Sequence, residues 1–225
     1  MSVSDGVRFF EAIAPAQAEE LRALGRRRRC PAGARLFNER DPGDAVLVVL
    51  SGRVKLSSVT AGGREAVLAI RVPGELIGEM SAIDAAPRSV SATALEPVEV
   101  LSISSEAFTA YLDRTPGVAL VLVRILCRRL READDKRTEF LAQDTVGRVC
   151  SRLAELADRF GAEGEDGTHV DIAITQDDLA GWTGSSREAV IRALRTLREL
   201  GWITTRRRGI TVLEPELLRR RAGAL

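Results

Sequence analysis

Cysteine is scarce in this sequence, and the few cysteines are far apart. The chain has three in 225 residues, at positions 30, 127 and 150. An odd number at such separations does not make a disulfide framework, and no two lie at the close spacing of a zinc site or a redox motif. We therefore expect a reduced, intracellular protein with no metal site.

Long hydrophobic runs are also missing. Hydrophobic residues make up 45% of the chain, yet no 18 of them are consecutive, so the sequence offers no candidate for a membrane-spanning helix. The short apolar stretch near the N-terminus is surrounded by Asp5, Arg8 and Glu11, which is not the pattern of a secretory signal peptide. We expect a cytoplasmic protein with no membrane partner.

Lysine is nearly absent, with two residues against 31 arginines, and this bias makes arginine richness alone a weak signal. The 33 basic residues balance the 32 acidic ones, but residues 182–225 hold ten arginines and four glutamates, a local charge of +6. A basic end on a neutral chain indicates a nucleic-acid contact surface, because neutralising phosphate supplies much of the affinity. A solvated arginine-rich tail is the alternative.

A length of 225 residues suits two modest domains. The first half of the chain is rich in short β-type runs. Turn signals such as Pro42-Gly43 and Pro73-Gly74 separate the runs, and this spacing predicts a small antiparallel, jelly-roll-like β-roll. A short helix over 16–24 and a basic run at 26–29, read as a solvated segment, precede it. The runs are 45–50, 53–59, 66–72, 90–94 and 98–103.

A long helix is predicted to follow the roll. Thr115 provides a cap and Pro116 a first-turn proline for a helix that ends near Leu141. Apolar residues spaced alternately by four and three predict a dimerisation seam, interrupted by Arg137. More apolar residues in its first half indicate packing on the roll as well. The seam positions are 119, 123, 126, 130, 133 and 140, and a domain boundary near 142–145 follows them.

The segment from Ile174 onward has the pattern of a helix-turn-helix. Thr175 is placed to cap a first helix that begins at Gln176, and Gly184 stands where a tight turn between helices needs a permissive backbone. Ser185 or Ser186 is placed to cap the second helix, whose inward face is formed by Val190, Leu194 and Leu197.

The outward face of that second helix suits base recognition. Arg187, Glu188 and Arg192 lie on it near the N-terminal end, the part of a helix-turn-helix that enters the major groove. Arginine donates a bidentate pair to guanine, and glutamate accepts from the cytosine amino group. Residues 202–213 then predict two short strands around a basic tip that includes Arg207, a wing that reaches phosphate. Double-stranded DNA is the expected partner.

Two segments of the roll carry a resemblance to a known family. Residues 76–80 (LIGEM) and 87–92 (PRSVSA) look like the phosphate-binding cassette of cyclic-nucleotide-binding domains. Together with the long helix and the motif SSREAVIR at 185–192, they make the chain similar to the Crp/Fnr transcription regulators, nearest to the branch of the cyclic-AMP receptor protein. The resemblance extends over essentially the whole chain.

The resemblance implies roles for the cassette residues. Backbone N–H groups from Gly78 onward face the phosphate, Glu79 accepts from the ribose 2′-hydroxyl, and the planar guanidinium of Arg88 donates to the phosphodiester anion. Ser89 adds a hydroxyl, and Met80 is the remaining residue that the resemblance places at the ligand. The alternative is that Glu79 and Arg88 merely pair with each other inside the roll.

The identity of the nucleotide is less clearly implied. The two hydroxyl residues that receive the adenine base in this branch fall at Ala133 and Asp134, and an ionised Asp134 only accepts hydrogen bonds. Cyclic AMP leads, with cyclic GMP or no ligand as alternatives, and Asp134 as a solvated residue is equally consistent. Three scattered cysteines do not supply an iron–sulfur cluster, and His169 lies outside the positions that a haem sensor uses.

These observations together predict an α+β protein with three parts. They are a β-roll over 1–115, a dimerisation helix and hinge over 116–143, and a winged helix-turn-helix over 144–225. The resemblance implies the function of a homodimeric regulator that binds a palindromic, TGTGA-like operator under nucleotide control, pivots at 141–144 and contacts RNA polymerase. A constitutive DNA-binding dimer is the rival; an enzyme is not expected, because no nucleophile–base pair or P-loop occurs.

Overall fold

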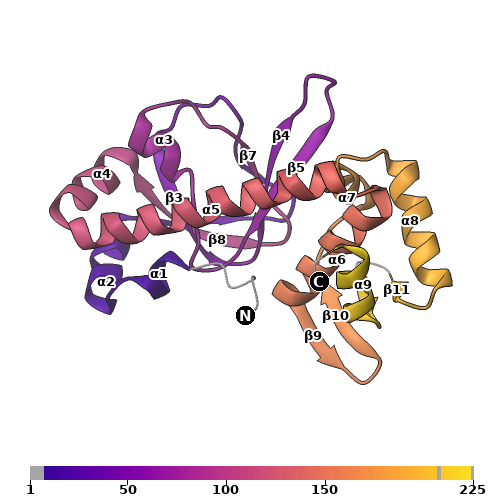
Figure 1. The fold of residues 1–225 in the computed structure, drawn as a ribbon. Helices are drawn as coiled ribbons and strands as arrows, with labels where there is room; N and C mark the ends of the chain where they lie inside the picture. Colours follow the sequence, from indigo (N-terminus) through magenta and orange to yellow (C-terminus); the bar gives the residue numbers. More distant parts are fainter. Residues whose placement is uncertain (1–7, 207–208, 224–225) are drawn as a thin grey trace. The chain divides into compact units, whose positions relative to one another are not determined.

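The computed structural model describes residues 8–206 and 209–223 and contains two compact units. Of the described residues, one unit contains 8–59 and Leu68–Arg131, and the other contains Thr60–Val67 and the residues from Glu132 onward. The long helix α5 (Pro116–Ala142) begins in the first unit and ends in the second (Figure 1).

The first unit is a β-roll of two four-stranded sheets, as the sequence predicts. One sheet has the order β1-β8-β3-β6 and the other β2-β7-β4-β5, and β8 pairs antiparallel with both β1 and β3. The basic run predicted to be a solvated segment is itself strand β1, although its arginines are exposed. The strands are β1 (Arg26–Cys30), β2 (Arg35–Phe37), β3 (Ala45–Ser51), β4 (Val54–Val59), β5 (Glu65–Arg71), β6 (Leu76–Ile77), β7 (Ser91–Ala94) and β8 (Val98–Ser104).

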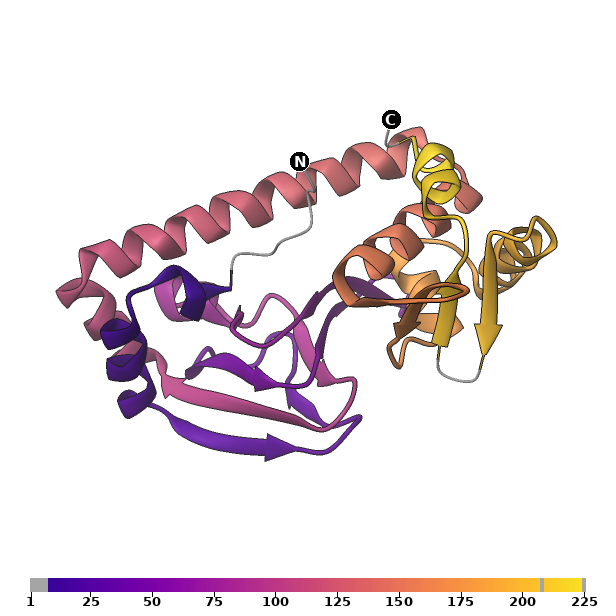
Figure 2. The same cartoon turned by 90° about the horizontal axis from the view of Figure 1, so that it is seen from below.

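Strand β3 separates the two cores of this unit. Val46 and Val48 face a core shared with the helices, while Leu47 and Val49 face a core between the two sheets. Because successive side chains point to opposite faces, a strand buried on both faces needs a continuous apolar run. The first turns of α5 lie beside α1 and α2 (Figure 2). The shorter helices are α1 (Phe9–Ala12), α2 (Pro15–Leu24), α3 (Glu79–Asp84) and α4 (Ser105–Arg114).

Helix α5 buries one face in the roll and leaves another open. Val118, Leu122 and Ile125 are buried. Of the predicted seam, Ala119 and Leu126 are half-buried within their own unit, which agrees with the expected packing of the first half of this helix on the roll. The dimerisation seam itself stays a prediction. The apolar residues left exposed include Leu120, Val123 and Leu130, with exposed fractions of 49%, 52% and 64%.

The second unit is a winged helix-turn-helix. Helices α6, α7 and α8 pack around buried leucines and Trp182. The predicted wing is present as β11 and β12, and it belongs to a four-stranded sheet of order β11-β12-β10-β9, to which residues 161–164 contribute strand β9. The elements are α6 (Thr145–Phe160), β9 (Gly161–Gly164), β10 (Gly167–Asp171), α7 (Gln176–Thr183), α8 (Arg187–Glu199), β11 (Ile203–Arg206), β12 (Gly209–Val212) and α9 (Pro215–Arg221).

Candidate nucleotide pocket and nucleic-acid interface

Arg88 is a buried cation at the centre of the predicted cassette. Its side chain is 2% exposed, and its guanidinium donates to the carbonyl oxygens of Gly78 (3.0 Å) and Ala45 (2.5 Å). It lies over the Phe37 ring at 4.4 Å and contacts the exposed Asp44 carboxylate at 3.3 Å. Neutral carbonyls and one solvated carboxylate balance this buried charge only in part.

Gly78 makes room for that guanidinium. Its φ is +81°, and a Cβ there would lie 2.1 Å from Arg88 Nη1. Any other residue at position 78 would be strained and would displace the arginine. The predicted role of a glycine at this point therefore has a steric basis as well as a conformational one.

Glu79 does not pair with Arg88 in this structure. The side chain is buried, and its Oε1 accepts from Arg129 Nη1 on α5 at 2.5 Å. Arg129 also donates to the Leu76 carbonyl at 3.0 Å. Arg129 was not among the predicted site residues, because nothing local in the sequence predicts a contact across 50 residues.

Two buried polar atoms in this pocket have no hydrogen-bond partner among the described residues. They are Glu79 Oε2, an acceptor, and Arg88 Nε, a donor. Buried polar groups without partners are costly and call for an explanation. A ligand with a hydroxyl and an anionic oxygen would satisfy both atoms.

The remaining predicted ligand residues lie at more open positions. Ser89 is exposed, and Met80 is 50% exposed at the start of α3. Asp134 lies on the part of α5 that belongs to the second unit, and its exposed carboxylate is 3.8 Å from Arg137. The role of these three residues stays a prediction.

The helix-turn-helix is capped as its residues predict. Thr175 Oγ1 accepts from the Asp178 amide, while the Asp178 carboxylate accepts from the Thr175 amide and hydroxyl at 2.9 and 2.7 Å. Ser186, and not Ser185, caps α8 by accepting from the Ala189 amide. Ser185 instead lies within hydrogen-bond distance of the Arg148 side chain. Gln176 is exposed in the first turn of α7.

Helix α8 buries one face and presents charges on the other. Val190, Ala193, Leu194 and Leu197 are buried, while Arg187, Glu188 and Arg192 are exposed. The backbone N–H of Glu188 and the Ser186 hydroxyl hold the pKa of the Glu188 carboxyl below its usual range. Glu188 is therefore an ionised acceptor beside two arginines, a combination that suits base edges.

The basic C-terminal end is only partly available to a nucleic acid. Arg206, at the end of β11, is exposed, and Arg207 lies outside the described residues. Arg219 pairs with Asp158 and Glu216, and Arg221 pairs with Asp144. Those two arginines join α9 to α6, so the local charge of +6 overstates the basic surface.

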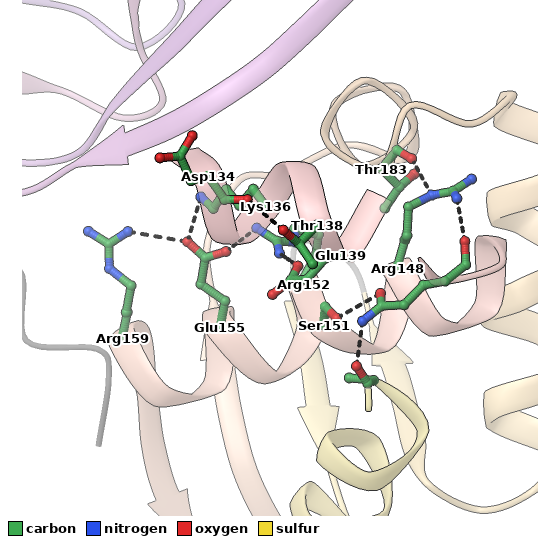
Figure 3. A network of polar contacts seen from close by, with 12 residues as sticks. Asp134, Lys136, Thr138, Glu139, Arg148, Ser151, Arg152, Glu155, Arg159 and Thr183 are labelled. Carbon is green, nitrogen blue, oxygen red and sulfur yellow. Dashed lines mark hydrogen bonds and ion pairs between the residues drawn. The ribbon is translucent and has the colours of Figure 1, made fainter. Parts of the chain in front are cut away.

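A cluster of charged residues joins the end of α5 to α6 (Figure 3). Glu155 lies near three cations: 2.5 Å from Arg152, 3.4 Å from Lys136 and 3.6 Å from Arg159. Arg152, whose side chain is 7% exposed, also pairs with Glu139. Burial alone would raise the pKa of Glu155, but the three cations offset it and the pKa is lowered. The pKa of Lys136 is also lowered, by burial first and then by the nearby arginines.

The predicted hinge at 141–144 is cross-linked to the surrounding helices. Arg148 donates to the Thr183 carbonyl at 2.8 Å and the Gln143 carbonyl at 2.7 Å (Figure 3). It also lies over the Phe140 ring at 4.7 Å. Gln143 also donates to the Ala222 carbonyl beyond α9. These contacts tie residues 136–144 to the helix-turn-helix.

Metal binding and membrane spanning are two further properties that bear on the kind of site. In the part of the chain that the structure describes, no three histidine, cysteine or acidic side chains gather in a way that suits a metal ion. None of the helices within 8–206 and 209–223 combines the length and the apolar character needed to cross a bilayer.

Comparison with known proteins gives two domain matches and several relatives. Residues 27–115 match the model of the cyclic nucleotide-binding domain, and residues 147–221 match that of the Crp-like helix-turn-helix domain. A CRP-like cAMP-activated global transcriptional regulator of Mycobacterium tuberculosis is 34% identical over 192 residues, 85% of this chain and 86% of the relative.

Two others extend the comparison. The cyclic AMP receptor protein of Thermus thermophilus is 36% identical over 213 residues, 95% of each chain. The solved structure of the c-di-GMP responsive global regulator CLP of Xanthomonas campestris has a TM-score of 0.79 at 25% identity, covering 88% of this chain and 99% of that one.

Proposed function

Because the chain belongs to the Crp/Fnr family of DNA-binding transcription regulators, we propose that a cyclic nucleotide bound in the β-roll controls its affinity for DNA. Cyclic AMP is the leading ligand. The proposal extends to a homodimer that binds a palindromic, TGTGA-like operator in the cytoplasm and contacts RNA polymerase.

The observation that carries this proposal is the pair of unsatisfied atoms in the pocket. Glu79 Oε2 lacks a donor and Arg88 Nε lacks an acceptor. A cyclic nucleotide offers a ribose 2′-hydroxyl to the first and a phosphate oxygen to the second. The planar guanidinium of Arg88 is suited to a phosphodiester anion, and Ser89 supplies a further hydroxyl at the edge of the pocket.

Arg129 connects the candidate ligand site to the long helix α5, so it supports transmission of ligand binding to that helix. It joins Glu79 to α5 by a 2.5 Å ion pair, so a ligand that binds Glu79 alters the surroundings of a residue on that helix. Coupling of roughly 1–3 kcal/mol would change DNA affinity by about 5- to 150-fold. The predicted pivot at 141–144 would pass this change to α8.

Exposed apolar residues support the homodimer. Leu120, Val123 and Leu130 recur at spacings of three and seven along α5, and a second copy of this helix is a partner with a matching face. Two α8 helices related by a two-fold axis would meet half-sites about 34–36 Å apart. In each, Arg187, Glu188 and Arg192 would contact base edges.

A second candidate function is constitutive DNA binding without a ligand. It is favoured by the contacts that the buried charged groups already make. Glu79 pairs with Arg129, and the Arg88 guanidinium donates to the carbonyl oxygens of Gly78 and Ala45. Asp134 in place of a hydroxyl residue also leaves cyclic GMP open, because a carboxylate accepts from the guanine N1–H and amino groups.

Calorimetric titration of the purified apo-protein with cyclic AMP and, separately, cyclic GMP tests the proposal. We expect micromolar binding of one of them, lost in Arg88→Ala and in the isosteric Glu79→Gln, which keeps the pocket filled. No heat with either nucleotide, together with no rise in Tm at concentrations where a tight ligand adds about 2–4 kcal/mol, would favour the constitutive dimer.

A further inference from the structure

The only histidine of the chain lies beside an arginine of the wing. His169 is on β10, and its Nδ1 is 2.8 Å from Arg206 Nη2 and 2.9 Å from Thr211 Oγ1. Its Nε2 is 2.9 Å from an Asp166 oxygen in the turn before β10. The imidazole on β10 therefore contacts one residue of β11, one of β12 and one of the turn between β9 and β10.

The strand register explains how these side chains meet. His169 is paired with Thr211 on β12, and Arg206 on β11 is paired with Gly209. Gly209 has no side chain, so the arginine can extend across β12 toward β10. Thr168 and Val170 face the core, whereas His169 lies on the other face of the sheet. Thr211 is only 3% exposed on that face, as expected if the imidazole and guanidinium cover it.

Hydrogen-bond chemistry indicates which arrangement of protons suits the contacts of this imidazole. A guanidinium only donates and an ionised carboxylate only accepts. Nδ1, which faces Arg206, must therefore accept, and Nε2, which faces Asp166, must donate. Only the neutral tautomer with its proton on Nε2 suits both Arg206 and Asp166, and a proton on Nδ1 would face the arginine. The Thr211 hydroxyl suits either form, because it both donates and accepts.

We propose that His169 is a positioning residue for DNA binding, which holds the Arg206 guanidinium toward the phosphate backbone while neutral and releases it when protonated. This inference rests on the proposed function, in which the wing contacts DNA. Nδ1 engages one of the five N–H donors of Arg206, so the others remain for phosphate oxygens. A guanidinium already held in place loses less conformational entropy when it binds.

Several charged groups surround His169. Asp166 and Arg206 contact it, Asp171 lies two residues along on the same face of β10, and Glu163 on β9 accepts from Thr168. Carboxylates and arginines ordinarily keep their charge between pH 5.5 and 8, and histidine is the side chain that ordinarily changes its charge there. With one histidine in the chain, a change in affinity over this interval has a single expected side-chain source.

Fluorescence anisotropy with the full-length protein tests this proposal. The probes are a duplex with TGTGA and TCACA half-sites centred one helical turn apart and a scrambled duplex, each with saturating cyclic AMP, at constant ionic strength from pH 5.5 to 8. The wild type is expected to lose affinity by about three- to tenfold on acidification, the scale of one exposed charge-assisted contact.

The variants separate positioning from a merely structural role. His169→Asn places an amide oxygen near the position of Nδ1 but does not titrate, so it should keep the affinity seen at pH 8 at every pH. His169→Leu removes the acceptor and should bind weakly at every pH, as should Arg206→Ala. A thermal melt at pH 8 checks that each variant is folded.

Two results would overturn the proposal. One is a wild-type affinity that rises on acidification and does so equally in Arg206→Ala, since His169 would then act as an additional cation. The other is a folded His169→Leu that binds like the wild type at all pH values. A phosphate contact is independent of sequence, so both duplexes report it. Equal affinity for the two duplexes would refute the operator proposal without affecting the pH comparison.

Discussion

At the scale of single residues, Arg88 and Glu79 are the two buried charged residues of the candidate nucleotide site in the β-roll. Both are charged, both are buried, and their partners come from other segments of the chain: Ala45 for the first and Arg129 for the second. A buried charge is retained only where partners or a ligand compensate it. The two atoms left without partners therefore indicate a binding site more strongly than a structural ion pair would.

The recognition helix allows a test at a single position. Arg192→Ala should weaken binding to the cognate duplex by about 1–3 kcal/mol, because an arginine with two bonds to a guanine edge is lost, while affinity for scrambled DNA stays nearly unchanged. Competition binding with both duplexes measures the difference. An equal loss on both would mean that Arg192, which is exposed on α8, contacts phosphate and not a base.

At the scale of elements, a cluster of ion pairs joins the end of α5 to α6. One carboxylate, Glu155, serves Lys136, Arg152 and Arg159, and Arg152 has a second partner in Glu139. Such a cluster is sensitive to the loss of its anion, because several cations would then remain partly buried without compensation.

Glu155→Gln should therefore lower the free energy of unfolding by about 2–3 kcal/mol at pH 7, less than for a fully buried pair because the cluster is partly exposed. Since the pKa of Glu155 is lowered from 4.5 in the folded state, its contribution is fully present above that pH and is lost as the pH falls through the folded pKa. Urea denaturation from pH 7 to pH 3 should show the difference between variant and wild type closing below about pH 4.

The control for this measurement is Glu199→Gln. That glutamate forms an exposed pair with Arg195, four residues earlier on α8, and exposed pairs of this kind contribute little. We expect almost no change in stability. Equal effects of the two substitutions would show that the corner cluster contributes no more than a surface ion pair.

At the scale of the whole molecule, the apolar residues exposed on α5 allow a test of the proposed homodimer. Leu130→Glu should shift the protein from dimer to monomer in sedimentation velocity at micromolar concentration and should weaken binding to the palindromic duplex, because a charge would enter the apolar contact. Leu200→Glu, at a leucine beyond α8 that is 54% exposed against 64% for Leu130, is the matched control and should remain dimeric. A dimeric Leu130→Glu protein would locate the interface elsewhere.

The sequence by itself determined the features that depend on neighbours along the chain. The roll's short strands, the helix from Pro116, the caps at Thr175 and Ser186 and the turn at Gly184 follow from periodicity, capping and backbone freedom. Each of these effects acts over a few residues, so it can be read from the order of residues alone. The architecture and the division of α8 into a buried and an exposed face were therefore predictable.

Only the tertiary structure decided which distant residues meet. It paired Glu79 with Arg129 and not with Arg88, and joined β9 and β10 to the wing. It also placed Arg221 on Asp144, and so removed that charge from the basic end. These contacts link positions separated by tens of residues, and the packing of sheets and helices brings them together. No spacing in the sequence encodes such distances, which is why Arg129 and the His169–Arg206 contact emerged only from the fold.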